Sequence, residues 1–154
     1  MTGIEFRIQS PSLPAAVALV GELDRELAAT YPGYPVNGID AAAFDAGNGV
    51  FVVGYVDGEP VAMGAFRPHQ DAAEIKRMFV LPHFRGRGLS RAMLEFLEQE
   101  AWRRGYRRGL LETGIKQIAA VGLYESAGWR ETEPFGDYDV NPSSRCYAKI
   151  LASD

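Results

Sequence analysis

The stretch "VLPHFRGRGLSRAM", residues 80–93, joins an apolar run to a helical pattern through a turn of alternating arginine and glycine. Apolar residues then recur at helical spacing until Gly105, so the sequence predicts a helix that begins near Leu89. The first turn of a helix carries unpaired N–H groups and a partial positive charge, which suits an anion. Gly86 and Gly88 would let a ligand approach the backbone closely. The stretch therefore predicts either an anion-binding loop or a glycine turn with solvated arginines, and alone it leaves both open.

Three arginines in this stretch, Arg85, Arg87 and Arg91, add guanidinium groups, which pair well with phosphate. Two familiar phosphate loops nevertheless do not fit. The mononucleotide loop needs a Lys-Ser or Lys-Thr pair after its last glycine, where this chain has Leu89-Ser90. The dinucleotide fingerprint needs a third glycine or an alanine where Arg91 stands. An anion site here would be of another kind.

Strand and helix patterns alternate on both sides of this stretch. Asp57-Gly58-Glu59 between two apolar runs predicts a hairpin. After residue 74 the order strand, helix, strand, helix predicts a parallel pair, with antiparallel partners on either side of it. The sequence therefore predicts a mixed, twisted α/β sheet with helices on both faces. The expected strands are 4–8, 49–56, 60–67, 74–81, 109–113, 129–134 and 145–151, and the expected helices are 14–27, 41–46, 89–101 and 118–127.

Length and composition limit the classes of function. The 154 residues, 47% of them hydrophobic, suit one domain spanning residues 1–154. There is no run of about 18 apolar residues, and the start "MTGIEFRIQS" lacks a secretion signal, so we expect a cytoplasmic protein without a membrane partner. The net charge of −4 argues against nucleic acid as a partner. Cys146 is the single cysteine, so we expect neither a disulfide nor a cysteine-based metal site.

Two segments of the chain, followed by a shorter one, resemble the GNAT superfamily of acyl-CoA-dependent N-acetyltransferases. They are "EIKRMFVLPHFRGRGLSRAMLEFLEQEAWRRGY" (74–106), "LETGIKQIAAVGLYESAGW" (111–129) and "PFGDY" (134–138). The resemblance implies a single GNAT domain, with a mostly antiparallel sheet of six to seven strands around a central parallel pair. In this family a loop written Gln/Arg-x-x-Gly-x-Gly/Ala wraps the pyrophosphate of coenzyme A. It falls here on Arg85, Gly88 and Ser90, and the serine departs from the usual glycine or alanine.

The same resemblance implies roles around acetyl-CoA, the expected co-substrate. The N–H of Met78 would meet the acetyl oxygen, and Gln117 stands where the family often has an asparagine that contacts the pantetheine arm. Tyr124 matches the general acid, although an aromatic at helical spacing is also typical of a core. The full set that the resemblance assigns to the cofactor is Met78, Phe79, Val80, Arg85, Gly86, Arg87, Gly88, Leu89, Ser90, Arg91, Gln117 and Tyr124.

Glu74 is the candidate general base, because some family members place at this position a glutamate that takes the proton of the amine, often through water. A structural salt bridge is the alternative, since charges in a strand covered on both faces are costly unless they are paired or face a cleft. Period-2 alternation predicts two faces for this strand. One face would carry Glu74, Lys76, Met78 and Val80, and the other Ile75, Arg77, Phe79 and Leu81.

The expected acceptor is a primary amine of a small molecule, an amino acid or a peptide. In this fold its pocket is usually built from the loop after the first helix and from the last strands, here "TYPGYPVNG" (30–38) and "EPFGDYDVNPSS" (133–144). Lys76 or Arg77 would hold a substrate carboxylate, whereas aromatic and acidic side chains in the two segments would suit a cationic amine, and both possibilities stay open. The candidates in these segments are Tyr31, Tyr34, Tyr138, Asp137 and Asp139.

Direct transfer between two bound substrates is the expected route, because a covalent route through Cys146 would need an adjacent base that the sequence does not locate. Two alternatives remain. One is a non-catalytic acyl-CoA-binding module of the same fold, since a fold alone does not confer activity. The other is transfer of a longer acyl group. A homodimer is possible, because edge strands of this fold often pair.

Overall fold

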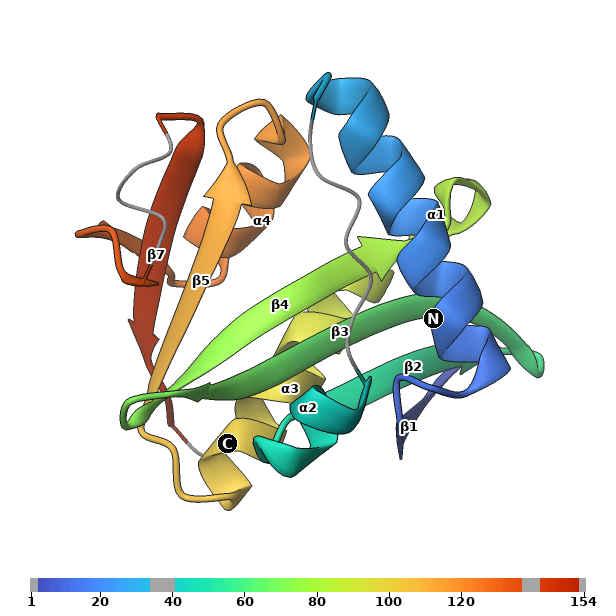
Figure 1. Cartoon of the computed structure of the whole chain (residues 1–154), viewed down its shortest axis with the longest axis horizontal. Coiled ribbons are helices and arrows are strands. Elements are labelled where there is room, and N and C mark those ends of the chain that lie inside the picture. Colours follow the sequence, from blue (N-terminus) through green and yellow to red (C-terminus); the bar gives the residue numbers. More distant parts are fainter. Residues whose placement is uncertain (1–2, 34–40, 137–141, 153–154) are drawn as a thin grey trace.

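The computed structural model describes residues 3–33, 41–136 and 142–152, which fold around one seven-stranded sheet (Figure 1). The strand order is β1-β2-β3-β4-β5-β7-β6, and every neighbouring pair is antiparallel except β4 and β5. The predicted mixed α/β sheet with a central parallel pair is confirmed. The elements are β1 (Ile4–Gln9), α1 (Pro14–Thr30), α2 (Ala41–Ala46), β2 (Val50–Val56), β3 (Glu59–His69), β4 (Ala72–Val80), the 3-10 turn Pro82–Phe84, α3 (Leu89–Arg103), β5 (Arg108–Gly114), α4 (Ile118–Ser126), β6 (Arg130–Thr132) and β7 (Ser144–Ile150).

Local residue choices account for several boundaries. Pro14 is the first residue of α1, a position where a missing N–H is harmless. The β2–β3 hairpin turns at Asp57 and Gly58, whose φ values of 51° and 80° suit a two-residue hairpin turn. α3 and α4 are followed by Gly105 and Gly128, which have φ values of 100° and 93°. No helix in the described ranges is long and apolar enough to cross a membrane.

The two faces of the sheet bury separate sets of side chains. α3 and α4 lie on one face and α1 and α2 on the other (Figure 1). Met93, Leu94 and Leu97 of α3 are fully buried on their face. Trp129, which follows α4, packs against β5 so closely that a Cβ at Gly109 would lie 2.6 Å from its ring. The indole thus requires glycine at this position of β5.

The parallel pair of strands is short. β4 pairs with β5 only from Ala73 to Ile75, opposite Gly109 to Leu111. β4 continues to Val80 and β5 to Gly114, so the second halves of the two strands have no ladder between them. Within the ranges that the structure describes, the β5-facing edge of residues 76–80 therefore has no strand opposite it, and the sheet opens between β4 and β5.

A bulge in β4 makes the predicted alternation wrong beyond Lys76. The β3–β4 register shifts between Met63 and Ala65, and Arg77 in the bulge has a φ of 60°. Met78 consequently packs with the core under α3, while Phe79 packs with the core under α1. The sequence pattern cannot show an extra residue in a strand, and that residue reverses the faces of those that follow.

Candidate active site

A cavity of about 650 Å³ lies where β4 and β5 separate. Its walls come from α1, β4, β5, α4 and the segment 143–144. Because both α1 and α4 contribute, the cavity reaches both faces of the sheet. Its charged lining residues are Lys76, Arg77, Glu112 and Lys116, and its polar ones are Tyr31, Thr113, Gln117, Tyr124, Ser143 and Ser144. Its larger apolar lining residues are Leu23, Leu27, Ile75 and Met78.

Tyr124 lines the cavity from α4 and is 6% exposed. Its ring lies 6.4 Å from that of Trp129 and 6.5 Å from that of Tyr147, measured between centroids. Burial raises the pKa of the phenol, and the negative charge of Glu112 raises it further. The phenol therefore carries its proton at neutral pH. The side chain is both a core aromatic and a cavity residue, and its role as the general acid stays a prediction.

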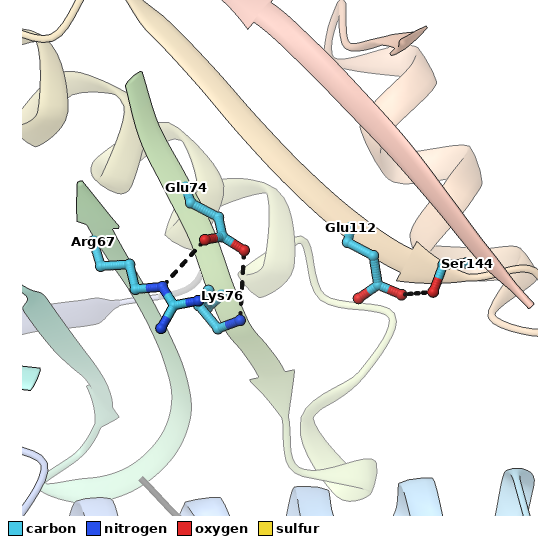
Figure 2. A network of polar contacts seen from close by, with 5 residues as sticks. All are labelled: Arg67, Glu74, Lys76, Glu112 and Ser144. Carbon is cyan, nitrogen blue, oxygen red and sulfur yellow. Dashed lines mark hydrogen bonds and ion pairs between the residues drawn. The ribbon is translucent and has the colours of Figure 1, made fainter. Parts of the chain in front are cut away.

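Glu112 is a cavity residue that the sequence analysis did not assign to the site. It lies on β5, and Ser144 of β7 donates a hydrogen bond of 2.6 Å from Oγ to its Oε2 (Figure 2). Ile75 and Leu111 are opposite each other, and both pack under α3 and α4. Because successive side chains of a strand point to opposite faces, their neighbours Glu74 and Glu112 share the other face of the sheet. The available signal was a carboxylate in an otherwise apolar strand, since such a group is costly unless it is paired or faces a cleft.

Glu74, the predicted base, has a side chain only 2% exposed and is held by two cations. Arg67, its cross-strand partner on β3, donates from Nε to Oε1 at 3.1 Å. Lys76 Nζ lies 3.5 Å from Oε2 (Figure 2). Glu74 is not among the residues that line the cavity, whereas Lys76 is. The ion pair proposed as the alternative for Glu74 is thus present.

The two predicted cations of β4 differ in their surroundings. Arg77 donates from Nη1 to Oδ1 of Asp24 on α1 at 3.0 Å, and Asp24 is 4% exposed. Both residues line the cavity, where 26% of the Lys76 side chain and 18% of the Arg77 side chain are exposed. Burial lowers the pKa of Lys76, and the charge of Glu74 offsets part of this effect. Arg77 is therefore tied to α1, and Lys76 presents a partly buried ammonium group to the cavity wall.

Tyr31 connects the end of α1 to the β5–α4 turn at one side of the cavity. Its hydroxyl accepts a hydrogen bond of 3.1 Å from the backbone N–H of Lys116. The Lys116 ammonium group lies 5.5 Å from the centroid of the Tyr31 ring. Gly114 makes this approach possible, because a Cβ there would clash with the tyrosine hydroxyl. Tyr31 thus lines the cavity, and its role in an acceptor pocket stays a prediction.

The arginine–glycine loop leads from β4 into α3 with its backbone uncovered. Gly86 and Gly88 both have a φ of 79°, and a Cβ at either position would meet no atom within 4 Å. Gly88 is the N-cap of α3, and among the described residues no side chain caps this helix end. The amides of Leu89, Ser90 and Arg91, in the first turn, lack acceptors within the helix. The predicted turn and helix start are confirmed.

The three loop arginines contact neighbouring elements. Arg85 Nη2 lies 2.7 Å from Oε1 of Glu26 on α1, and its Nε donates to the carbonyl of Val80 at 2.9 Å. Arg91 donates to Ser126 on α4. Arg87 donates to the carbonyl of His83 at 3.3 Å. The loop thus lies between the ends of α1 and α4, at the end of β4 that borders the cavity.

The remaining residues predicted to contact the pantetheine arm fall into two groups. Gln117 lines the cavity, and its Oε1 accepts a hydrogen bond of 3.2 Å from the N–H of Gly114. Phe79 and Val80 are 6% and 5% exposed and pack in the two cores rather than lining the cavity. Four of the residues predicted for the acceptor pocket lie outside the described residues, namely Tyr34, Asp137, Tyr138 and Asp139.

Comparisons with known proteins agree with this geometry. A model of the "Acetyltransferase (GNAT) family" matches residues 16–129. A relative from Azospirillum brasilense named IAA acetyltransferase is 35% identical over 153 residues, covering 98% of this chain and 100% of the relative. An N-acetyltransferase of Bacillus subtilis, uncharacterized and named YsnE, is 40% identical over 80 residues, 51% of this chain and 53% of the relative.

Solved structures share the fold. A Klebsiella pneumoniae protein, provisionally assigned as an acyl-CoA N-acyltransferase, aligns with a TM-score of 0.82 and 26% identity over 97% of this chain and 99% of its own. A GNAT family acetyltransferase from Elizabethkingia anophelis, solved with acetyl-CoA bound, aligns with a TM-score of 0.68 and 17% identity over 96% of this chain and 98% of its own. With the family model covering most of the chain, this protein belongs to the GNAT family of acetyltransferases.

Proposed function

We propose that this protein is an N-acetyltransferase that moves an acetyl group from acetyl-CoA to a primary amine of a small molecule, amino acid or peptide, by direct transfer while both substrates are bound. The observation that carries the proposal is the cavity between β4 and β5, which has a buried phenol in its wall and opens to both faces of the sheet. Two substrates can therefore meet in the opening, one from each face.

The residues of the arginine–glycine loop fit the diphosphate of coenzyme A. Uncovered glycines, an uncapped helix N-terminus and flanking guanidinium groups together favour a bound anion. The amides from Gly86 to Arg91 would hold the diphosphate, with Arg85, Arg87 and Arg91 adding charge. When bound, acetyl-CoA supplies an activated acetyl thioester.

The chain's own groups would then act at the opening of the sheet. The edge of β4 at Met78 has no strand opposite it, so its backbone is placed to contact the pantetheine arm and the acetyl oxygen. One donor aimed at that oxygen contributes about 3 kcal/mol to the barrier. Tyr124 keeps its proton at neutral pH, as a donor to the departing thiolate must. Gln117 lies beside these groups in the wall.

Where the acceptor carries an anionic group, we propose that Lys76 rather than Arg77 binds it. Both side chains line the cavity, but Arg77 Nη1 lies 3.0 Å from the buried carboxylate of Asp24, whereas Lys76 Nζ lies 3.5 Å from that of Glu74 and its side chain is more exposed. Tyr31 closes the same side of the cavity by its contact with Lys116. An amine that also carries a carboxylate, such as an amino acid, fits this arrangement.

Acetyl-CoA turnover over a panel of amines tests the proposed function. The panel should contain amino acids, simple alkylamines and peptides, with free thiol and the mass of the acetylated amine measured together. We expect equal amounts of thiol and acetylated product for at least one amine. Binding of coenzyme A without product from any amine would support the non-catalytic module instead, and faster turnover of butyryl-CoA than acetyl-CoA would support a longer acyl group.

Replacing a loop glycine should weaken coenzyme A binding beyond its effect on folding. In Gly88→Ala the backbone of the alanine must adopt a φ of 79°, and its methyl group occupies the space above the loop. The conformational cost is about 1–2 kcal/mol, and we expect the Kd for coenzyme A to rise by about tenfold or more, the equivalent of about 1.4 kcal/mol. Calorimetric titration measures the Kd, and urea unfolding measures the stability.

Gly58→Ala is the matched control for this loop variant. Gly58 lies in the β2–β3 turn, has a φ of 80° and is equally open at its Cβ position. We expect the same loss of stability and an unchanged Kd. Equal Kd values for the wild type and Gly88→Ala would remove the loop from the binding site.

A further inference from the structure

The ring and the backbone of Tyr124 hold its phenol in the cavity wall. Among the hydrogen bonds between described residues, none involves the hydroxyl. The ring centroid lies 6.4 Å from that of Trp129 and 6.5 Å from that of Tyr147. The carbonyl of Tyr124 also accepts a hydrogen bond of 2.9 Å from the backbone N–H of Trp129. Trp129 thus contacts Tyr124 through both its ring and its backbone, and its own placement bears directly on the phenol.

The indole of Trp129 is fixed by a carboxylate of another helix. Its Nε1 donates a hydrogen bond of 3.0 Å to Oε2 of Glu98 on α3. Trp129 is 2% exposed, and the opposite edge of its ring fits against Gly109 of β5. A hydrogen bond to a carboxylate is stronger than one between neutral groups. Glu98 therefore sets the orientation of the indole against which the Tyr124 ring packs.

Glu98 is in turn held by Lys149 of β7. The ammonium nitrogen lies 2.7 Å from Oε1 of Glu98 and donates to the carbonyl of Ala127, directly after α4, at 2.8 Å. The side chains of Lys149 and Glu98 are 27% and 14% exposed, so the pair is largely shielded from water. Neither residue lines the cavity. Lys149, Glu98 and Trp129 thus connect α3, β7 and the end of α4 around the backbone of Tyr124.

We propose that Glu98 and Lys149 are positioning residues for proton transfer from Tyr124 and that they act through Trp129. This inference rests on the proposed acetyltransferase function. In the step concerned, the carbon–sulfur bond breaks with its electrons on sulfur, and sulfur takes the phenol proton. A proton released by the newly acetylated nitrogen then restores the phenol. The two positioning residues touch neither substrate, since they lie outside the cavity wall.

Proton transfer depends steeply on the place of the donor. The phenol oxygen must come within hydrogen-bond reach of the departing sulfur. A displacement of about 1 Å caused by a change far from the chemistry can cost about 10²-fold in rate. Without its bond to Glu98, the indole can turn in its pocket, and the ring of Tyr124 can follow it. The acetyl-CoA site, which lies on other elements, would be unaffected.

Glu100 provides a matched control for Glu98 on the same helix. It is 7% exposed, and its carboxylate is paired with Arg103 and Arg104 at 2.9 Å and 2.8 Å. These partners belong to the last turn of α3 and its C-cap, and Glu100 does not line the cavity. Both glutamates are thus shielded carboxylates with cationic partners, but the partners of Glu98 alone lead to Tyr124.

The first test compares Glu98→Leu, Glu98→Gln and Glu100→Leu with the amine that the wild type acetylates fastest. For Glu98→Leu we expect kcat to fall by about 10- to 10²-fold, with an unchanged Kd for coenzyme A. Glu98→Gln keeps an oxygen that accepts from the indole, so it should retain most of the activity. Glu100→Leu should lose stability in urea, as Glu98→Leu does, but keep its kcat.

A double variant distinguishes positioning of Tyr124 from a general effect on the fold. We expect Glu98→Leu combined with Tyr124→Phe to be no slower than Tyr124→Phe alone, because a phenol that is absent cannot be misplaced. Two changes that act independently would instead multiply their effects on kcat. Steady-state kinetics of the four proteins, from wild type to double variant, measure this coupling.

The indole contact can also be followed without any assay of activity. The chain has two tryptophans, Trp102 and Trp129, which give two indole N–H signals in nuclear magnetic resonance. Trp129→Phe assigns them. The Trp129 signal should shift and exchange faster with solvent in Glu98→Leu, and it should stay unchanged in Glu100→Leu.

Two results would overturn the inference. One is a wild-type kcat in Glu98→Leu, and the other is an equal loss from this change with and without the Tyr124 hydroxyl. Lys149→Met supplies a second variant if Glu98→Leu is poorly folded, with a loss in kcat that should again disappear in the Tyr124→Phe background. A wild type that binds coenzyme A but acetylates no amine would remove the proposed function itself, and with it any catalytic role of this contact.

Discussion

Tyr124→Phe is expected to lower kcat by about 10²–10⁴-fold, the usual contribution of a positioned proton donor. The substitution removes a single oxygen from a side chain that is 6% exposed and packed against Trp129 and Tyr147, so the ring contacts are kept. The departing thiolate would then have to take its proton from water. Steady-state kinetics with the best amine of the panel measure the loss, and coenzyme A binding should be unchanged.

Tyr147→Phe is the matched control. Tyr147 is fully buried, and its hydroxyl donates a hydrogen bond of 3.4 Å to Glu125, but the residue does not line the cavity. Removing this hydroxyl should lower the free energy of unfolding slightly and leave kcat near the wild-type value. Equal kcat values for Tyr124→Phe and the wild type would place the proton donor elsewhere.

The direction of the pKa shift of Tyr124 adds a second measurement. Burial raises this pKa above the ordinary value, so the protonated phenol favours the folded state. That stabilising contribution is fully present below about pH 10, the ordinary pKa of tyrosine, and is lost as the pH rises through the folded-state value. Ultraviolet titration should therefore show one fewer late-ionising tyrosine in Tyr124→Phe than in the wild type.

Much of the fold could be predicted because its signals are local. The turn at Asp57-Gly58, the helix start at Pro14 and the glycine loop before α3 each depend on a few neighbouring residues. The parallel pair follows from the order of the elements. The loop glycines were recognisable for the same reason, since their positive φ values and open surroundings are properties of the turn itself.

The site residues that the sequence did not reveal depend on contacts between distant segments. Asp24 and Arg77 are 53 residues apart, and nothing near either one indicates the ion pair. The bulge at Arg77 depends on the register with β3 and reverses the expected faces of Met78 and Phe79. Glu112 becomes a cavity residue only because β4 and β5 separate beyond their three paired positions. Strand periodicity contains none of this information.

The Asp24–Arg77 ion pair is expected to have the largest effect on stability. Asp24→Asn should lower the free energy of unfolding by about 3–5 kcal/mol, as loss of one member of a buried ion pair does. The side chains of Asp24 and Arg77 are 5% and 18% exposed, so water compensates the remaining guanidinium poorly. Urea unfolding measures the change. Glu5→Gln breaks the exposed Arg7–Glu5 pair, whose side chains are 47% and 63% exposed, and should leave the urea midpoint close to that of the wild type.

A double variant tests whether Asp24→Asn loses stability because a buried charge is left unpaired or because the packing of α1 on β4 is disturbed. In Asp24→Leu with Arg77→Met both charges are replaced by apolar groups of similar size, which often restores the stability lost when one partner is removed. We expect this variant to unfold at a higher urea concentration than Asp24→Asn, because no buried charge is left behind. A double variant less stable than Asp24→Asn would mean that the pair's geometry, rather than its charge, holds α1 on β4. Arg77 lies in the bulge with a φ of 60°, which is strained for a residue with a side chain. If the bulge relaxes in the double variant, the cavity wall at Lys76 and Met78 should change shape as well.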